Sequence, residues 1–197
     1  MTTNPLRPDD RFDTTATTTA VESAVSPAVW LLGATRDCGV STLERFLAFT
    51  GDSGYRWPAG DDREYTSPYV VVVARNTYKS LTAAQNLALD HRDGRVGDGA
   101  ELLGLVTVAA SPTIDKPIRQ HRQVVAAAFA RHWSIDWHRS LLSADTGRLP
   151  RWHPLDADAT APTASIPADV VTLGIELTNV VHERIPTLFG APSGAQS

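Results

Sequence analysis

The sequence predicts an α/β protein in which helices flank a small parallel sheet. Short apolar runs, typical of buried strands, alternate along the chain with segments whose apolar residues recur at helical spacing. The clearest strand is Tyr69–Ala74, because its four consecutive valines form an unbroken β-branched run that suits a parallel strand covered on both faces. This alternation favours a parallel sheet with right-handed crossover connections.

The first predicted unit is a strand, a loop and a helix. Val29–Leu32 is an apolar run, and the loop after it leads into a helix whose first turn Ser41 or Thr42 can cap. Apolar residues recur at helical spacing in that helix: Leu43, Phe46 and Leu47. Residues 50–68 are rich in glycine and proline, which predicts turns rather than a strand.

The elements after the valine-rich strand continue the alternation. In order, they are a helix over 79–91, a Gly/Asp-rich loop, a strand over 102–109, a helix over 117–130, a short edge strand over 132–135, one or two helical turns within 136–142 and an amphipathic helix over 169–184. Residues 143–168 are rich in proline, aspartate and glycine and predict a long surface excursion.

The chain of 197 residues fits one domain with a tail at each end. We expect the domain to cover residues 27–185. Residues 1–26 are rich in Thr, Asp and Pro and have little apolar content, so they are predicted to be a disordered N-terminal tail. Residues 186–197 are predicted to be a flexible C-terminal tail.

Composition excludes several classes of protein. The net charge of −4 argues against general affinity for nucleic acid, which needs a basic surface. No segment approaches the roughly 20 apolar residues of a membrane span, and no secretory signal is visible. A single cysteine allows no internal disulfide. We therefore expect a cytoplasmic protein without a membrane span.

The loop after the first strand is similar to a phosphate-binding loop that lacks its lysine. In the pattern G-x-x-x-x-G-K-[ST], backbone N–H groups cradle phosphates, the lysine reaches the terminal phosphates and the hydroxyl holds Mg²⁺. Val40 stands in the place of the lysine and Ala34 in that of the first glycine, while Gly33 comes one residue early. The end of the pattern is kept: Gly39, Ser41 and Thr42.

We expect this loop to keep part of an anion-binding scaffold, since a helix N-terminus offers free N–H groups and a partial positive charge. Arg36 can replace some of the lost charge, whereas Asp37 opposes it. The candidate binding residues are Gly33, Ala34, Arg36, Cys38, Gly39, Val40, Ser41, Thr42 and, after the valine-rich strand, Arg75. The interpretation that we favour is a plain strand-to-helix turn inherited from a nucleotide-binding ancestor, and retained nucleotide or phosphate binding is the alternative.

Cys38 precedes a helix, where a thiol can acquire a lowered pKa. A cysteine phosphatase needs C-x5-R, but Glu44 stands where that arginine belongs and Arg45 comes one residue late. We therefore expect a small, half-buried thiol and predict no catalytic residue. The histidines lack the spacing of metal ligands, so no metal site is predicted.

Ligands of open α/β sheets bind beyond the carboxyl ends of the strands. Arg75 and Asn76 follow the valine-rich strand, and we expect them to line one edge together with the loop 33–42 and Ser111-Pro112. A pocket at that edge is one interpretation, and ordinary loop polarity is the other.

The order of elements resembles a shortened member of the ParA/MinD-type P-loop ATPase superfamily. Three pieces carry the resemblance: residues 31–34 with 39–43, residues 70–75 followed by 80–84, and residues 102–106. More closely, the chain resembles an uncharacterised actinobacterial family of degenerate P-loop proteins. Members of that family have a lysine-free Gly-x-Ser-Thr loop, an arginine after a valine-rich strand, a Leu-Leu-Gly-Leu-Val strand and a Pro-x-x-Arg helix. In this chain the last three are Arg75, residues 102–106 and residues 117–120. The resemblance covers about residues 28–142.

Departures from the superfamily weigh against ATP hydrolysis. Thr35 occupies the position of the extra signature lysine, and Val108 lies near that of the base-reading asparagine. No apolar strand between the first helix and the valine-rich strand ends in a Walker-B-type aspartate. Phosphoryl transfer depends on such positioning and charge. If a cofactor binds, the resemblance implies ATP or GTP with Mg²⁺.

Three tryptophans, Trp133, Trp137 and Trp152, lie among arginines. Exposed aromatic and arginine residues are enriched at protein interfaces, whereas buried tryptophans would form core. Both interpretations stay open.

The leading hypothesis is a non-catalytic P-loop-fold protein that binds a protein partner. The resemblance implies a role beside partition, conjugation or secretion machinery and a homodimer. One alternative is an active ATPase or GTPase whose missing groups come from Arg36, Arg75 or a second subunit. The other is a nucleic-acid-associated regulator.

Overall fold

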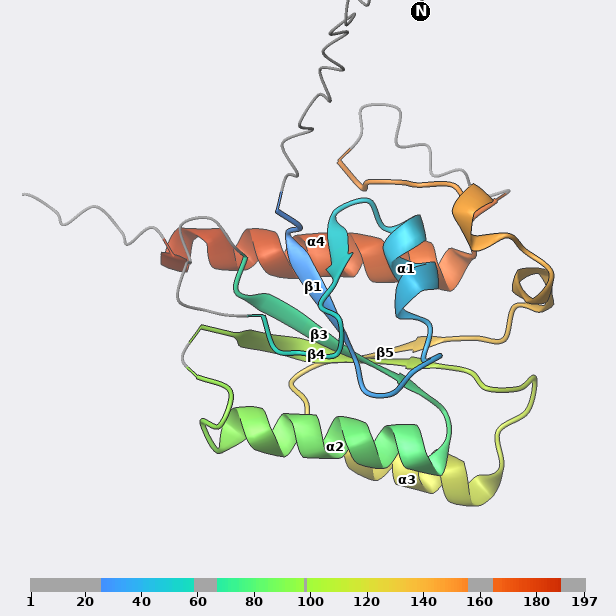
Figure 1. The fold of residues 1–197 in the computed structure, drawn as a ribbon, viewed down its shortest axis with the longest axis horizontal. Helices are drawn as coiled ribbons and strands as arrows, with labels where there is room; N and C mark the ends of the chain where they lie inside the picture. The colour runs from blue at the N-terminus through green and yellow to red at the C-terminus, as the bar shows by residue number, and fades with distance from the viewer. Residues whose placement is uncertain (1–25, 59–66, 98, 156–164, 189–197) are drawn as a thin grey trace, which may run out of the picture.

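A five-stranded parallel sheet in the order β2-β1-β3-β4-β5 forms the centre of the computed structural model, which describes residues 26–58, 67–97, 99–155 and 165–188 (Figure 1). The strands are β1 (Val29–Gly33), β2 (Thr50–Asp52), β3 (Tyr69–Arg75), β4 (Glu101–Val108) and β5 (His132–Ile135). All neighbouring strands pair in parallel. The predicted fold class, a small parallel sheet flanked by helices, is confirmed.

Helices cover both faces of this sheet. They are α1 (Val40–Phe46), α2 (Tyr78–Arg92), α3 (Lys116–Ala126) and α4 (Ala168–Leu188), with short 3-10 helices η1 (Arg139–Leu142) and η2 (Thr146–Arg148). In Figure 1, α1 and α4 lie on one side of the sheet and α2 and α3 on the other. No helix in the described part of the chain is long and apolar enough to cross a membrane.

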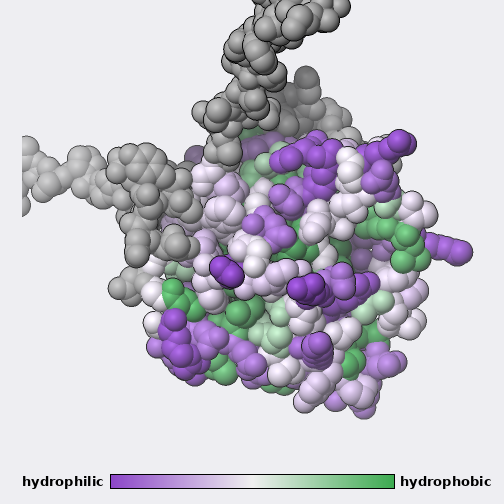
Figure 2. Space-filling model, in the orientation of Figure 1, coloured by the Kyte–Doolittle hydropathy of each residue, from purple (hydrophilic) through white to green (hydrophobic). Residues whose placement is uncertain are grey.

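The valine run of β3 explains why two hydrophobic cores form. Val71 and Val73 belong to the core under α1 and α4, whereas Val70 and Val72 belong to the core under α2 and α3. Successive side chains of a strand point to opposite faces, so only an unbroken apolar run can serve both cores. On the face of the molecule shown in Figure 2, apolar residues lie in small groups between polar ones, as on an ordinary protein surface.

Two local predictions are wrong near the N-terminus. Residues 50–68 were interpreted as a turn-rich stretch, which missed the edge strand β2 at Thr50–Asp52, paired with β1. Helix α1 begins at Val40 after Gly39, whose φ of 107° is left-handed, and no side chain caps it. Ser41 and Thr42 therefore lie inside the first turn and are not caps.

The later boundaries also differ from the predicted ones. Helix α3 ends at Ala126, before the predicted end at 130. Helix α4 continues to Leu188, so residues 186–188 are helical rather than part of a flexible tail. The predictions of tails over 1–25 and 189–197 lie outside the described residues.

The predicted surface excursion after β5 is fixed to the core at Trp152. The backbone N–H of Trp152 donates to the Phe46 carbonyl over 2.9 Å, and the Trp152 carbonyl accepts from the backbone N–H of Ala48 over 2.9 Å. Trp152 and Ile166 are buried against α4 and α1. Only part of 143–168 is therefore a surface loop, and residues 156–164 lie outside the described residues.

Candidate functional site

A cavity of about 360 Å³ opens where β1, β3, β4 and β5 end. The loop after β1 and helix α1 form one wall, and residues 135–142, which follow β5, form the opposite wall. Arg75, at the end of β3, lines the cavity between them. This is the position at which open α/β sheets bind ligands. We call it the loop cavity.

Six of the nine candidate binding residues line the loop cavity: Cys38, Gly39, Val40, Ser41, Thr42 and Arg75. The other three do not. Gly33 is buried beside Tyr55 and Cys38, Ala34 packs toward the α2 core, and Arg36 is exposed outside the cavity lining. The structure therefore brings six of the predicted residues together at one cavity, whereas Arg36 does not line it.

The side chain of Cys38 lies inside the loop that follows β1. Cys38 is buried, at 2 % exposure. Burial raises the pKa of its thiol, and the backbone N–H groups of Thr35, Val40, Cys38 and Ala34 around the sulfur oppose that rise. The sequence predicted a half-buried thiol and allowed a lowered pKa. In the structure the thiol is fully buried and its pKa is raised. The sulfur lies among loop N–H groups of the kind that face phosphate in a functional phosphate loop.

Two valines complete the closure of the loop. Val40, in the place of the lysine, is buried in the core under α1 rather than pointing out into solvent. A Cβ on Gly39 would lie 3.3 Å from Val108 Cγ2, so the end of β4 packs directly on the loop backbone. Position 39 favours glycine for two reasons: its φ is left-handed, and an added Cβ would press on Val108.

Polar contacts hold the loop against β3 and α2. Arg75 Nη1 donates to the Asp37 carbonyl over 2.9 Å. The hydroxyls of Thr35 and Ser80 lie 2.9 Å apart, and Ser80 Oγ also accepts from the Arg75 backbone N–H over 3.0 Å. One N–H group of Arg75 is therefore engaged by the loop itself.

The opposite wall contains a fixed His–Asp pair. His138 Nε2 lies 2.9 Å from both carboxylate oxygens of Asp169, at the start of α4. The same carboxylate accepts the backbone N–H groups of Asp136 over 2.7 Å and of Val170 over 2.9 Å. Sequence reasoning missed this pair, because the two residues are far apart in the chain and follow no known spacing.

Two of the three clustered tryptophans belong to the core. Trp133 and Trp152 are buried, and Trp133 Nε1 donates to Glu176 Oε2 over 2.6 Å. Trp137 is half-buried and lines the loop cavity. The interpretation as an exposed aromatic interface is therefore wrong for Trp133 and Trp152.

A second cavity of about 380 Å³ lies on the α3 side of the same edge. It is lined by Asn76, Ser111 and Pro112, and on its α3 side by Ile114 and Arg122. Residues that the sequence assigned to one edge site are thus divided between two cavities. Both cavities share lining residues: Ala109, Asp136 and Trp137. We call the second one the α3 cavity.

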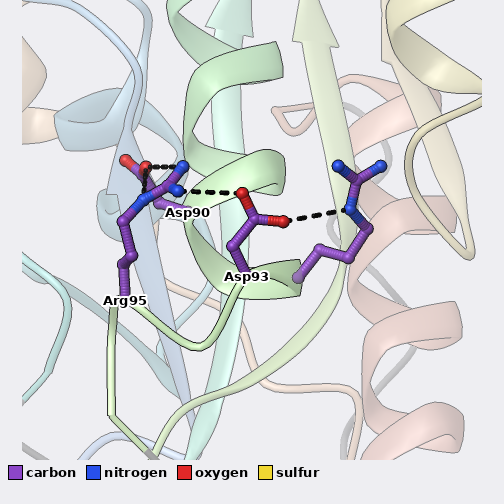
Figure 3. Close-up of polar contacts among 4 residues, drawn as sticks. Asp90, Asp93 and Arg95 are labelled. Atoms are coloured by element: carbon purple, nitrogen blue, oxygen red, sulfur yellow. Dashed lines mark hydrogen bonds and ion pairs between the residues drawn. The ribbon is translucent and has the colours of Figure 1, made fainter.

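The ion pairs at the far end of α2 are separate from both cavities. Arg95 contacts Asp90 over 2.7 Å and Asp93 over 2.8 Å, where α2 ends and the chain turns toward β4 (Figure 3). Helix α2 begins at the carboxyl ends of the strands, so its C-terminal end lies toward the opposite edge. The side chains are exposed, and such pairs contribute little to stability.

No group of three or more His, Cys, Asp or Glu side chains that could hold a metal ion is found in the described ranges. No protein-family model, curated protein sequence or solved structure matches the chain.

Proposed function

We propose that this chain is a non-catalytic, cytoplasmic α/β protein that acts by binding a protein partner in the loop cavity. The observation that supports this most is the closed loop, in which the Cys38 sulfur lies among the loop N–H groups and Val108 packs against Gly39. The absence of the lysine removes the cation that phosphoryl transfer requires. The loop then serves as a wall of the cavity rather than as a phosphate cradle.

The cavity has the chemistry of a socket for an apolar side chain. Tyr55 and Leu142 line it and are 51 % and 67 % exposed, so both present apolar surface at its mouth. Val108 and Leu141 are half-buried and add apolar surface, and Arg75 supplies a positive charge. Apolar anchors that enter such pockets dominate the affinity of protein interfaces. The partner we propose therefore inserts an apolar side chain.

Site-specific photo-crosslinking tests this proposal. A photo-reactive phenylalanine analogue is placed at Leu142 in the full chain, in the cells that produce it, and the crosslinked species is identified by mass spectrometry. Leu155 provides the matched control, because it is an equally exposed leucine that does not line the cavity. We expect one defined protein adduct from position 142 and none from position 155.

The crosslink also decides which partner is present. An adduct with a second copy of this chain would support the homodimer, and an adduct with a component of partition, conjugation or secretion machinery would support the role that the resemblance implies. The adduct should disappear on Tyr55→Asp, which places a charge in the socket. Equal labelling from both positions, or none from position 142, would overturn the proposal.

Weak nucleotide binding is the second candidate, because Ser41, Thr42 and Arg75 line the same cavity. A nucleotide there would meet two hydroxyl groups and one cation. It would also meet Asp37 and Asp136, whose negative charges oppose phosphates.

A further inference from the structure

Strand β5 is the last strand of the sheet, and among the described residues it pairs only with β4. The carbonyl groups of Arg131 and Ile135 accept N–H groups from the β4 side. Because successive residues of a strand direct their N–H and carbonyl groups to opposite sides, those of His132 and Ser134 point away from the sheet. Both residues are exposed, and no hydrogen bond to these outward groups is found in the described ranges. We call this row of groups the β5 edge.

The β5 edge lacks the features that usually protect an edge strand. The strand contains no proline, glycine or lysine, and its pairing with β4 has no bulge. The next outward N–H group along the chain, that of Asp136, donates to the Asp169 carboxylate over 2.7 Å. The open stretch therefore covers His132 and Ser134, which offer two N–H and two carbonyl groups to a further strand.

Helix α3 places positive charge beside the β5 edge. It carries Lys116, Arg119 and Arg122 and no acidic residue. Arg122 reaches the strand, since its Nη1 lies 3.5 Å from Ser134 Oγ, and its charge joins burial in lowering the pKa of His132. In the part of the chain that the structure describes, neither arginine pairs with a carboxylate. The edge is therefore complementary to an acidic strand.

The same charges disfavour a second copy of this chain at the β5 edge. Antiparallel pairing of β5 with itself about a two-fold axis would place both α3 helices on one face of the joined sheet. Arg119 and Arg122 of each copy would then lie on the side toward the other copy, and like charges across such a seam are destabilising. The charge pattern favours a different, acidic partner.

We infer that the β5 edge accepts an extended segment of a partner protein as a sixth strand, with acidic side chains at alternate positions toward α3. In strand addition, backbone hydrogen bonds supply affinity and alternate side chains supply specificity. Side chains on one face of a strand repeat every ~6.8 Å, so successive acidic groups can follow the cations of α3. Asp136 limits the acidic run to the length of β5. His132 and Ser134 do not line the loop cavity, so this surface does not depend on the proposed socket.

NMR titration of the full chain with designed peptides tests the inference. The probe is a short peptide of alternating threonine and glutamate, and the matched control is the same peptide with lysine in place of glutamate. In the free chain, the amide protons of His132 and Ser134 should exchange fast and those of Trp133 and Ile135 slowly, because the latter bond to β4. The acidic peptide should shift and protect the first pair, and the basic peptide should do neither.

Backbone methylation of the peptide tests strand pairing without altering the protein. One version is N-methylated at every glutamate and the other at every threonine. Only one set of peptide N–H groups faces β5 in a given pairing, so one version should bind at least about tenfold more weakly and the other should bind as the parent does. Antiparallel pairing predicts the loss for methylated glutamate, and parallel pairing predicts it for methylated threonine.

Three variants of the chain locate the contact. Ser134→Pro removes an outward N–H group and leaves the β4 ladder intact, so it should weaken the acidic peptide by about tenfold. Arg122→Gln should weaken the peptide by about threefold, because an exposed charge contact is lost. Arg148→Gln is the control for charge, since Arg148 is exposed in η2 beside α1, and it should leave the affinity unchanged.

The inference is overturned if the acidic peptide does not bind at millimolar concentration, or if both methylated versions bind as tightly as the parent. Equal binding of the acidic and basic peptides would also overturn it. Slow exchange of His132 and Ser134 in the free chain would do the same, since the edge would then already be covered. The photo-crosslink at position 142 should persist in Arg122→Gln, so failure of this inference and failure of the partner proposal give different results.

Discussion

Cys38 and Val40 determine what the loop after β1 can do. The sequence predicted that Val40 stands where a phosphate-binding loop would have its lysine, because a motif position can be read from spacing alone. It did not show that the Cys38 sulfur fills the loop, because that depends on how tightly the loop closes against Tyr55, Val108 and Arg75. The sequence could therefore indicate which residues lie together at this edge of the sheet, but it could not show that the Cys38 side chain lies inside the loop.

The reactivity of Cys38 tests its burial. Because burial raises the thiol pKa, the native thiolate is scarcer than in a free cysteine at any pH near neutral. We expect slow alkylation by iodoacetamide in the native protein and fast alkylation in denaturant, measured by mass spectrometry. The raised pKa contributes stability below the ordinary thiol pKa of about 8.5, and this contribution is lost as the pH rises above that value. Native alkylation as fast as in denaturant would refute the burial.

Gly39→Ala tests the packing of Val108 on the loop. The substitution should cost about 1–2 kcal/mol from the left-handed backbone, and crowding against Val108 should add to that cost. Gly94→Ala is the control, because Gly94 also has a positive φ but an added methyl group there would have no neighbour within 4 Å. Urea unfolding should show the larger loss for Gly39→Ala, and Val108→Ala should relieve part of it. Equal losses would show that Val108 does not press on the loop.

At the scale of elements, strands and helices with a strong hydrophobic pattern could be predicted. A short strand that depends on pairing with its neighbour could not. The strand β3 and helix α2 follow from an apolar run and a helical period that are visible in the sequence. The strand β2 consists of Thr, Gly and Asp, and it forms only because the edge of β1 offers hydrogen-bonding groups. Its last residue, Asp52, accepts the Gly54 N–H over 2.8 Å in a turn and is exposed.

Asp169 connects the start of α4 to the residues after β5. Asp169→Ala should destabilise the protein by about 2–3 kcal/mol, because it leaves His138 and two backbone N–H groups without their acceptor. Glu183→Gln on the same helix should change stability by less than about 0.5 kcal/mol, since its ion pair with Arg131 is long and exposed. Chemical denaturation measures both. Similar stabilities for the two variants would refute the role of Asp169.

At the scale of the molecule, one sheet separates the core under α1 and α4 from the core under α2 and α3. The parallel order of the strands could be predicted because alternating strands and helices leave few other arrangements. The presence of two cavities at the carboxyl edge of the sheet could not be predicted. It depends on Ser134 and Ile135 facing opposite sides of β5 and on Trp137 lining both cavities. The loop cavity and the α3 cavity therefore became distinguishable only in three dimensions.

Gly174 tests how α4 closes the larger core. A Cβ at this position would lie 2.8 Å from Trp152 Cζ3 and 2.9 Å from Leu47 Cδ2. Alanine normally stabilises a helix by about 1 kcal/mol relative to glycine, but overpacking costs about 1–3 kcal/mol. We expect Gly174→Ala to lower the melting temperature, measured by circular dichroism. A higher melting temperature would show that Trp152 does not pack against α4 this closely.

The central claim is that the loop after β1 forms a wall of the loop cavity and does not cradle phosphate. Calorimetric titration with ATP, GTP and a non-hydrolysable analogue, each with and without Mg²⁺, tests this most directly. We predict no binding heat at millimolar nucleotide. Micromolar binding that is abolished by Ser41→Glu, at an exposed position of the cavity wall, would contradict the claim and restore the nucleotide-binding interpretation.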